Sequence, residues 1–323
     1  MRHPVILPVA LSAALSAGLA AQAEPLSLTL PLDCQPGDTC FIQNYVDSDP
    51  GPGIRDYTCA GLSYDGHKGT DFGLPSIAAM QAGVDVFAAA PGRVRGTRDG
   101  VPDRLYDGKA DLGGKDCGNG VVIEHAGGWE TQYCHMKRGS VSVRKGQQVA
   151  AGDRLGQVGL SGRTQFPHLH ISVRHDGEQI DPFRPDAAPD SCGAAEAPLW
   201  AEDLPYQPGG LMNAGFATGV PDYADVKAGT AGLDAIPANA PALVIWGFGF
   251  GTRKGDEMDL RIDGPDGPFF EHTEVLKAPK AQTYRASGKR LHAPLSPGTY
   301  TGTVVLRRDG EELSRKVVTA EIG

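Results

Sequence analysis

Short runs of β-forming residues, separated by glycine, fill the sequence from about residue 28 to residue 183. Examples are residues 84–88, 121–123 and 171–173. Gly, Pro or Asp recurs about every eight to twelve residues, which is the spacing of turns in antiparallel sheets and barrels. Helical periodicity is nearly absent. The pattern therefore predicts a mostly β chain whose first folded part, residues 24–190, is built on an antiparallel sheet.

A second β-patterned region occupies residues 241–323, where alternating strands are joined by Asp-Gly turns. This length and pattern predict a small β-sandwich-like domain. Trp246, Phe248 and Phe250 alternate along its first strand, and we expect them to fill the sandwich core rather than form a binding platform. Residues 191–240 are rich in Pro, Ala, Gly and Asp, which is typical of a linker.

The N-terminus has the parts of a secretory signal. A basic start is followed by an apolar run over residues 5–20 and by small residues ahead of an expected cleavage after Ala23. The apolar run is too short for a stable transmembrane anchor, and no other long apolar stretch follows. We therefore expect residues 1–23 to be removed, and the mature chain to be periplasmic or secreted without a transmembrane anchor.

The chain has six cysteines, and an even number in an exported protein indicates disulfides. Cys117 and Cys134 flank two β-type runs, residues 120–125 and 129–135, which a hairpin would bring together. We predict a bridge between these two cysteines. The sequence leaves the pairing of the other four cysteines open; they are Cys34, Cys40, Cys59 and Cys192. A bridge between Cys34 and Cys40 would close the shortest loop.

The formal net charge is −9, and acidic and basic residues are interspersed without a basic patch. Nucleic acid is therefore excluded as a partner. Residues 97–116 form a long polar segment with five aspartates, but these lack the alternating ligand pattern of a calcium-binding loop. We expect a solvated loop at the rim of the first domain.

Two short histidine motifs supply the chemistry. His67 precedes Asp71 by four residues, and Gly66 and Gly69 disfavour a helix there and favour a loop that enters a strand. His168 and His170 are two apart, so on a strand they point to the same side. His135 follows the second run of the predicted hairpin. This inventory fits a hydrolytic zinc site, which needs three protein ligands and nearby groups that move protons.

The other histidines of the mature chain have no such neighbours, and we assign them no role; they are His125, His175, His272 and His292. No His-Glu-x-x-His helix occurs, so the glutamate base of the commoner zinc proteases is missing. Histidine is suited to replace it because its proton exchanges near neutral pH.

From residue 64 to residue 183 the chain resembles the lysostaphin-type, LytM-like zinc endopeptidases that cut peptide cross-links of bacterial peptidoglycan. The matching motifs occur in the family's order and at about its spacing. They are His67-x-x-x-Asp71, Gly118-Asn119-Gly120-Val121-Val122-Ile123, Tyr133-Cys134-His135, Gly159-Leu160-Ser161-Gly162-Arg163-Thr164, Pro167-His168-Leu169-His170 and Asp181-Pro182-Phe183.

The resemblance implies an antiparallel sheet with a long substrate groove. It implies that His67, Asp71 and His170 bind Zn²⁺, and that His135 and His168 are the catalytic histidines. Which of the two is the base stays open. Some members of the family have lost ligands and only activate amidases, whereas every ligand position is filled here.

The sequence therefore predicts a zinc metalloendopeptidase whose substrates are peptidoglycan peptides. Two alternatives stay open: a non-catalytic wall-binding regulator of amidases, and a secreted protease that acts on glycine-rich proteins. The C-terminal β-region matches no family that we can name. Our hypothesis is that it positions the first domain on its substrate or packs against its groove.

Overall fold

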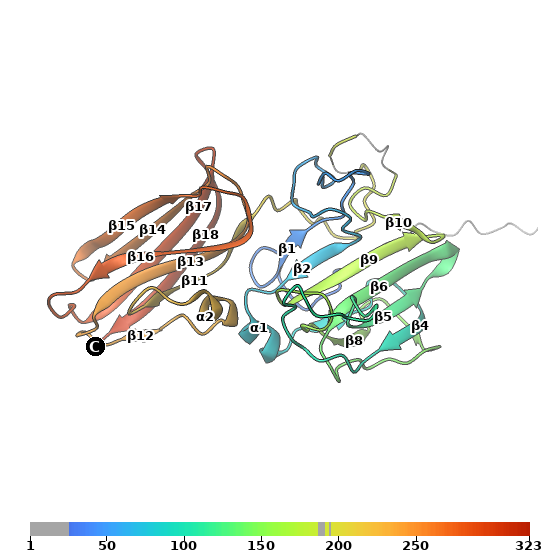
Figure 1. Cartoon of the computed structure of the whole chain (residues 1–323), viewed down its shortest axis with the longest axis horizontal. Coiled ribbons are helices and arrows are strands. Elements are labelled where there is room, and N and C mark those ends of the chain that lie inside the picture. Colours follow the sequence, from blue (N-terminus) through green and yellow to red (C-terminus); the bar gives the residue numbers. More distant parts are fainter. Residues whose placement is uncertain (1–25, 187–190, 194) are drawn as a thin grey trace, which may run out of the picture.

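The computed structural model describes residues 26–186, 191–193 and 195–323 of the chain. The predicted signal segment, residues 1–23, lies outside the described residues. The described part is mostly β, as predicted, and has two lobes (Figure 1). None of the helices in this part is long and apolar enough to cross a membrane.

The first lobe is built on an eight-stranded sheet in which every pairing is antiparallel. Its strands are β1 (Phe41–Asn44), β2 (Thr70–Gly73), β4 (Gly92–Arg98), β5 (Asn119–Glu124), β6 (Trp129–Met136), β7 (Gln148–Val149), β9 (His168–His175) and β10 (Glu178–Ile180). They run in the order β1-β2-β9-β6-β5-β4-β7, with β10 paired to β9. A small second sheet pairs β3 (Asp85–Phe87) with β8 (Arg154–Gln157).

The two faces of the large sheet differ because side chains alternate along each strand. Phe72 of β2 pairs with Leu169 of β9, and both are fully buried in the core of the lobe. The neighbouring pair, Asp71 and His170, must then point to the opposite face. Burial of the apolar face thus fixes the register that brings the polar pair together.

The predicted hairpin forms between β5 and β6, with the turn at residues 126–128. Cys117 and Cys134 are joined by a disulfide, as predicted. The other bridges are Cys34–Cys40 and Cys59–Cys192, so all six cysteines are paired.

The polar segment at residues 97–116 is held by its own carboxylates. Asp99 accepts hydrogen bonds from the backbone N–H groups of Gly139 and Val141. Asp103 accepts them from Arg138 and Leu160. Two of the five aspartates therefore fasten this loop to the turns beside the sheet.

The second lobe consists of two sheets that enclose their own apolar core (Figure 1). One has three strands in the order β11-β13-β16: β11 (Gly210–Ala217), β13 (Ala242–Thr252) and β16 (Lys280–Arg290). The other has five strands in the order β12-β18-β17-β14-β15: β12 (Ala235–Ile236), β18 (Glu311–Ile322), β17 (Gly298–Arg308), β14 (Glu257–Gly264) and β15 (Gly267–Val275).

The second lobe begins earlier than the sequence led us to expect. Residues 191–240 were expected to form a linker, but they contain β11, β12 and the helix α2 (Tyr223–Ala228). Leu211, Ala214 and Phe216 of β11 are buried in the sandwich core. The Gly- and Ala-rich composition hid this strand, because such residues carry little β-propensity of their own.

Trp246, Phe248 and Phe250 are buried, but not in the sandwich core, so this expectation was wrong. The residues of β13 that lie in the sandwich core are the alternate ones, such as Leu243 and Ile245. The three aromatic residues lie on the outer face and join the core of the first lobe instead. Phe250, for example, has its ring centroid 5.6 Å from that of Phe41 in β1.

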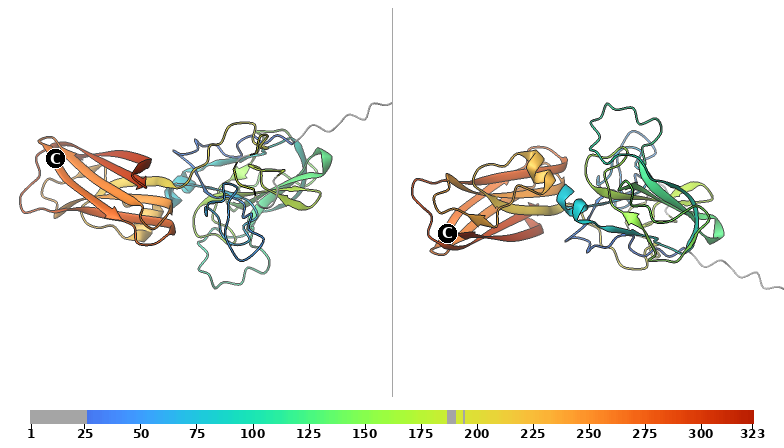
Figure 2. Two further views of the ribbon diagram at one scale, coloured as in Figure 1. Left: turned by 90° about the horizontal axis from the view of Figure 1, so that it is seen from above. Right: turned by 90° about the horizontal axis from the view of Figure 1, so that it is seen from below.

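The two lobes lie end to end, with the short helices α1 (Ile77–Ala82) and α2 next to each other at the junction (Figure 2). Ser76 caps α1 by accepting a hydrogen bond from the N–H of Ala79. Gly229 ends α2 with a φ of 83°, and a Cβ there would lie 2.5 Å from Ser76 Oγ. Glycine at this position therefore permits both the turn and the close approach of the helices.

Candidate metal centre

Three polar side chains meet where β2 and β9 run side by side. Asp71 and His170 are direct partners in the antiparallel ladder. His67 lies in the turn that leads into β2, so its imidazole reaches the same point from beside the sheet. Gly69 leaves room for this arrangement, because a Cβ there would lie 2.6 Å from the ring of His170.

The three side chains present one ligand atom each to a common centre. His67 Nε2 lies 3.1 Å from Asp71 Oδ1 and 3.1 Å from His170 Nδ1. His170 Nδ1 lies 2.8 Å from the same carboxylate oxygen. His67 and Asp71 are each only 2% exposed. Within the part of the chain that the structure describes, these residues are the single His/Cys/Asp/Glu group with metal-ligand geometry.

The far side of each of these side chains is held by a hydrogen bond. His67 Nδ1 lies 2.7 Å from the carbonyl oxygen of Tyr45, so it donates and leaves Nε2 with a free lone pair. The other Asp71 oxygen, Oδ2, accepts from Asn44 Nδ2 at 2.9 Å. His170 Nε2 is 2.9 Å from Ser172 Oγ. Two imidazole lone pairs and a carboxylate oxygen therefore converge, and this donor set fits Zn²⁺.

His168 and His135 flank this group. Their ring centroids are 4.6 Å apart, and that of His135 is 6.0 Å from that of His170. His168 Nδ1 lies 3.0 Å from both Phe166 O and Thr164 Oγ1. His168 Nε2 lies 3.4 Å from Asp71 Oδ1.

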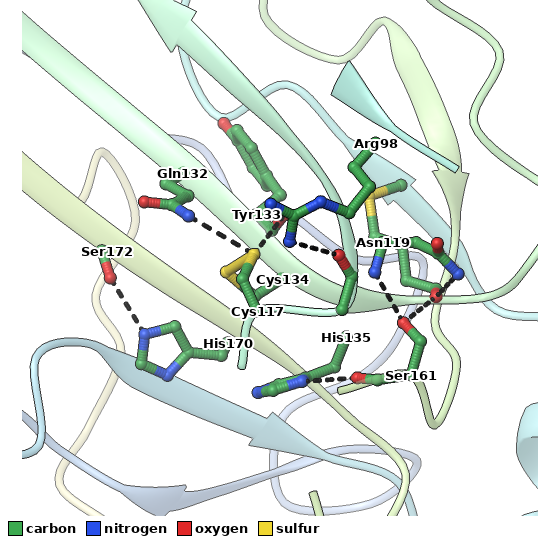
Figure 3. Close-up of a disulfide and its surroundings, with 12 residues drawn as sticks. Arg98, Cys117, Asn119, Gln132, Tyr133, Cys134, His135, Ser161, His170 and Ser172 are labelled. Atoms are coloured by element: carbon green, nitrogen blue, oxygen red, sulfur yellow. Dashed lines mark hydrogen bonds between the residues drawn. A yellow bond between two sulfur atoms is a disulfide. The ribbon is translucent and has the colours of Figure 1, made fainter. Parts of the chain in front are cut away.

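His135 is held in an unusual backbone conformation. Alternation along β6 would turn it away from the face that Cys134 occupies, but His135 has a φ of 62° in the left-handed region. The β5–β6 pairing is irregular here, and the N–H of His135 donates to Cys117 O at 2.8 Å. His135 Nδ1 donates to the carbonyl oxygen of Ser161 at 2.8 Å (Figure 3). The disulfide thus lies directly beside the histidine, and both line the same groove.

Burial and neighbouring charge shift the pKa values of this cluster. Burial opposes the charged form of Asp71, but His67 and His168 hold its pKa well below the usual range. Burial also disfavours protonation of His67, yet the Asp71 carboxylate raises the pKa of that imidazole. Burial and then the neighbouring imidazoles lower the pKa of His135. His135 is therefore a neutral imidazole, with its Nε2 free to accept a proton.

The cluster opens into a groove along the sheet. Its lining residues include cationic, carboxylate and amide groups that can bind a polar chain. They are Tyr64, Lys68, Asp116, Cys117, Gln132, Cys134, His135, Arg163, His170, Ser172 and Arg174. Two of the cations are already paired: Arg163 with Asp116, and Arg174 with Glu130.

The structure therefore brings all five residues that the sequence singled out into one site. His125 and His175 lie elsewhere: the first bonds to Pro91 O, and the second stacks on Trp129. The supporting groups at Asn44 and Tyr45 were not predicted from the sequence. These residues precede Asp71 by more than twenty positions, and no motif marks them.

Comparison with known proteins agrees with this geometry. Residues 65–182 match peptidase family M23. The peptidoglycan DD-endopeptidase ShyA of Vibrio cholerae is 32% identical over 118 residues, which cover 36% of this chain and 22% of that protein. The DD-carboxypeptidase/endopeptidase Mpg of Neisseria meningitidis is 37% identical over 103 residues, which cover 32% of this chain and 22% of that protein.

Among solved structures, a zinc containing peptidase from Vibrio cholerae is 26% identical. The match covers 47% of this chain and 41% of that one, with a TM-score of 0.30. The chain spans about a fifth of the length of the two curated relatives.

Proposed function

Residues 65–182 form a peptidase family M23 domain, and on that premise we propose that the chain is a zinc-dependent endopeptidase that hydrolyses peptide cross-links of bacterial peptidoglycan. One observation carries the proposal. The ligand atoms of His67, Asp71 and His170 converge in a buried pocket, and two further imidazoles face the same centre. The name of one relative, the peptidoglycan DD-endopeptidase ShyA, supports peptidoglycan as the substrate.

His67 Nε2, Asp71 Oδ1 and His170 Nδ1 would hold the metal ion. A zinc ion supplies a Lewis acid that polarises the scissile carbonyl and makes water a better nucleophile. Asn44 and Tyr45 orient two of these ligands from behind. Loss of any of the three ligands should therefore remove the metal.

His135 and His168 handle protons beside this centre. Each has its Nδ1 engaged by the backbone, so each presents Nε2 towards the reacting groups. One imidazole is neutral, and its Nε2 accepts the proton of the attacking water. The other is the imidazolium form, protonated on both nitrogens, so that its Nε2–H donates to the oxygen that becomes negative during the attack while its Nδ1–H stays on the backbone carbonyl. Both are almost fully buried, which strengthens such interactions.

The three disulfides are consistent with an extracytoplasmic location. Together with the signal-like N-terminus, they favour a periplasmic or secreted enzyme. Such an enzyme would meet the cell wall directly.

The test combines zinc content with digestion of purified sacculi. Wild type should carry one zinc per chain and release soluble fragments. His135→Ala should keep the zinc and lose about a hundredfold or more of the rate. His175→Ala, on the same strand as two site residues but stacked on Trp129, is the matched control and should behave as wild type.

A metal-free wild type without hydrolytic activity would refute the proposal and leave the role of an amidase regulator. Faster cleavage of a glycine-rich protein than of sacculi, tested side by side, would refute peptidoglycan as the substrate.

A further inference from the structure

A cleft lies between the two lobes, beside the catalytic histidines. It has a volume of about 450 Å³ and is open to solvent. Three segments far apart in the sequence line it: the loop at residues 97–116, the segment before β9, and the second lobe. The lining residues are Leu105, Tyr106, Gln165, Phe166, Tyr223, Lys227, Lys280, Ala281 and Gln282.

Contacts between the lobes fix the shape of this cleft. Gln43 of β1 donates to Met212 Sδ at 2.8 Å and accepts from Gln282 Nε2 at 3.1 Å. The apolar contact between Phe41 and Phe250 lies in the same junction. A preformed cleft costs a ligand little reorganisation.

The side chain of Phe166 lies between the cleft and the catalytic residue His168. Phe166, in its wall, stacks on the imidazole of His168 with 4.4 Å between ring centroids. On the next loop, Tyr106 lies under the guanidinium of Arg163, which lines the groove at the metal centre. A chain bound in the groove could therefore continue into the cleft.

The charge of the cleft is opposite to that of the whole molecule. The chain has a net charge of −9, yet the lining contains two lysines and no aspartate or glutamate. Within the described residues, neither Lys227 nor Lys280 has an ion-pair partner, and Lys227 lies over the Tyr223 ring at 4.8 Å. Such a site favours a carboxylate. Gln165 and Gln282 add amide groups that can pair with a peptide backbone.

We infer that this cleft binds a carboxylate-bearing peptide strand of the cross-linked substrate, with Lys227 and Lys280 as its anchoring cations. This rests on the proposed function and adds a role for the second lobe, which supplies both lysines. The strand would extend from the scissile bond past Phe166.

The test measures binding separately from hydrolysis. In a full-length His135→Ala background, a fluorescently labelled, cross-linked muropeptide dimer is titrated and its anisotropy followed. Lys227→Ala and Lys280→Ala should each raise Kd by roughly threefold to tenfold, as loss of about 1 kcal/mol would. Lys280→Arg should bind nearly as the parent does.

Two controls complete the design. Lys254→Ala removes an exposed lysine from a turn of the second lobe outside the cleft and should leave Kd unchanged. A dimer whose carboxylates are amidated should bind the parent as weakly as the unmodified dimer binds a variant with both substitutions, Lys227→Ala/Lys280→Ala.

Hydrolysis of the same dimer by wild type is measured in parallel, so that the outcomes distinguish the proposed enzymatic function from the proposed role of the cleft. Unchanged Kd in the lysine variants, with hydrolysis by wild type, overturns the cleft assignment alone. If the parent binds the amidated dimer as tightly as the unmodified dimer, a carboxylate is not the group that the cleft recognises. Absence of both binding by the parent and hydrolysis by wild type overturns both proposals.

Discussion

Removal of the Cys117–Cys134 disulfide should affect catalysis more than its effect on stability would suggest. The bridge closes 17 residues, and the chain-entropy relation gives about 3 kcal/mol of stabilisation at 25 °C for a loop of that size. The same relation gives about 5 kcal/mol for Cys59–Cys192, which spans 133 residues, and about 2 kcal/mol for Cys34–Cys40, which spans 6. The stabilisation expected from the Cys117–Cys134 bridge, which lies beside His135, is therefore intermediate among the three.

Its position gives it a second effect. Cys134 directly precedes His135, and Cys117 O accepts the N–H bond that holds the left-handed backbone there. Without the bridge, His135 can relax towards regular strand geometry and turn away from the groove. A displacement of about 1 Å at a catalytic group can cost on the order of a hundredfold in rate. We expect a fall in kcat of tenfold to a hundredfold in Cys117→Ala/Cys134→Ala.

The assay compares the three double alanine variants. Each is unfolded in urea under circular dichroism, and kcat is measured at a temperature where the variant is fully folded. Cys59→Ala/Cys192→Ala should lose the most stability and keep its kcat, while Cys117→Ala/Cys134→Ala should lose less stability and show the largest fall in kcat. If kcat followed the loss of stability across the three variants, the positioning argument would be refuted.

Two further predictions concern buried carboxylates. Burial raises the pKa of Asp181 to about 7, so the stability that this group contributes is fully present below pH ~4 and is lost as the pH rises through about 7. The free energy of unfolding of Asp181→Asn should therefore exceed that of wild type by up to ~4 kcal/mol at pH 8 and by little at pH 4. Urea titrations at both pH values measure this difference, and an equal difference at the two pH values would contradict the prediction. Asn44→Ala removes the partner of Asp71 Oδ2 and should weaken zinc binding about tenfold to a hundredfold in chelator competition, and unchanged affinity would show that Asn44 does not orient the ligand.

Each histidine motif could be predicted because its residues are local in sequence, whereas the motifs lie about a hundred residues apart and the resemblance to a known family placed them in one site. Two residues apart on a strand share a face, so the spacing of His168 and His170 is enough to predict that they lie together. Their supporting groups are not local. Tyr45 O is hydrogen-bonded to His67, 22 residues away in the sequence, and Ser161 O to His135, 26 residues away. Only the register of the sheet brings these groups together.

The C-terminal lobe shows a different limit. Alternation correctly predicted that Trp246, Phe248 and Phe250 share one buried face, but it cannot say what covers that face. Both faces of β13 are apolar, so the strand carries two sets of core residues. The inner set fills the sandwich, and the outer set needs a partner, which the first lobe provides through residues such as Phe41.

This two-sided burial decides how the role of the second lobe can be tested. Deletion of residues 240–323 would remove Trp246, Phe248 and Phe250 from a shared core and uncover Phe41 of β1. β1 pairs with β2, the strand that carries Asp71, so the deletion would disturb the metal centre even if the lobe never touched substrate. Loss of wall hydrolysis on truncation therefore cannot separate a binding role from a structural one. Substitution of Lys227 and Lys280 leaves the shared core intact, and a change in Kd would then report the cleft itself.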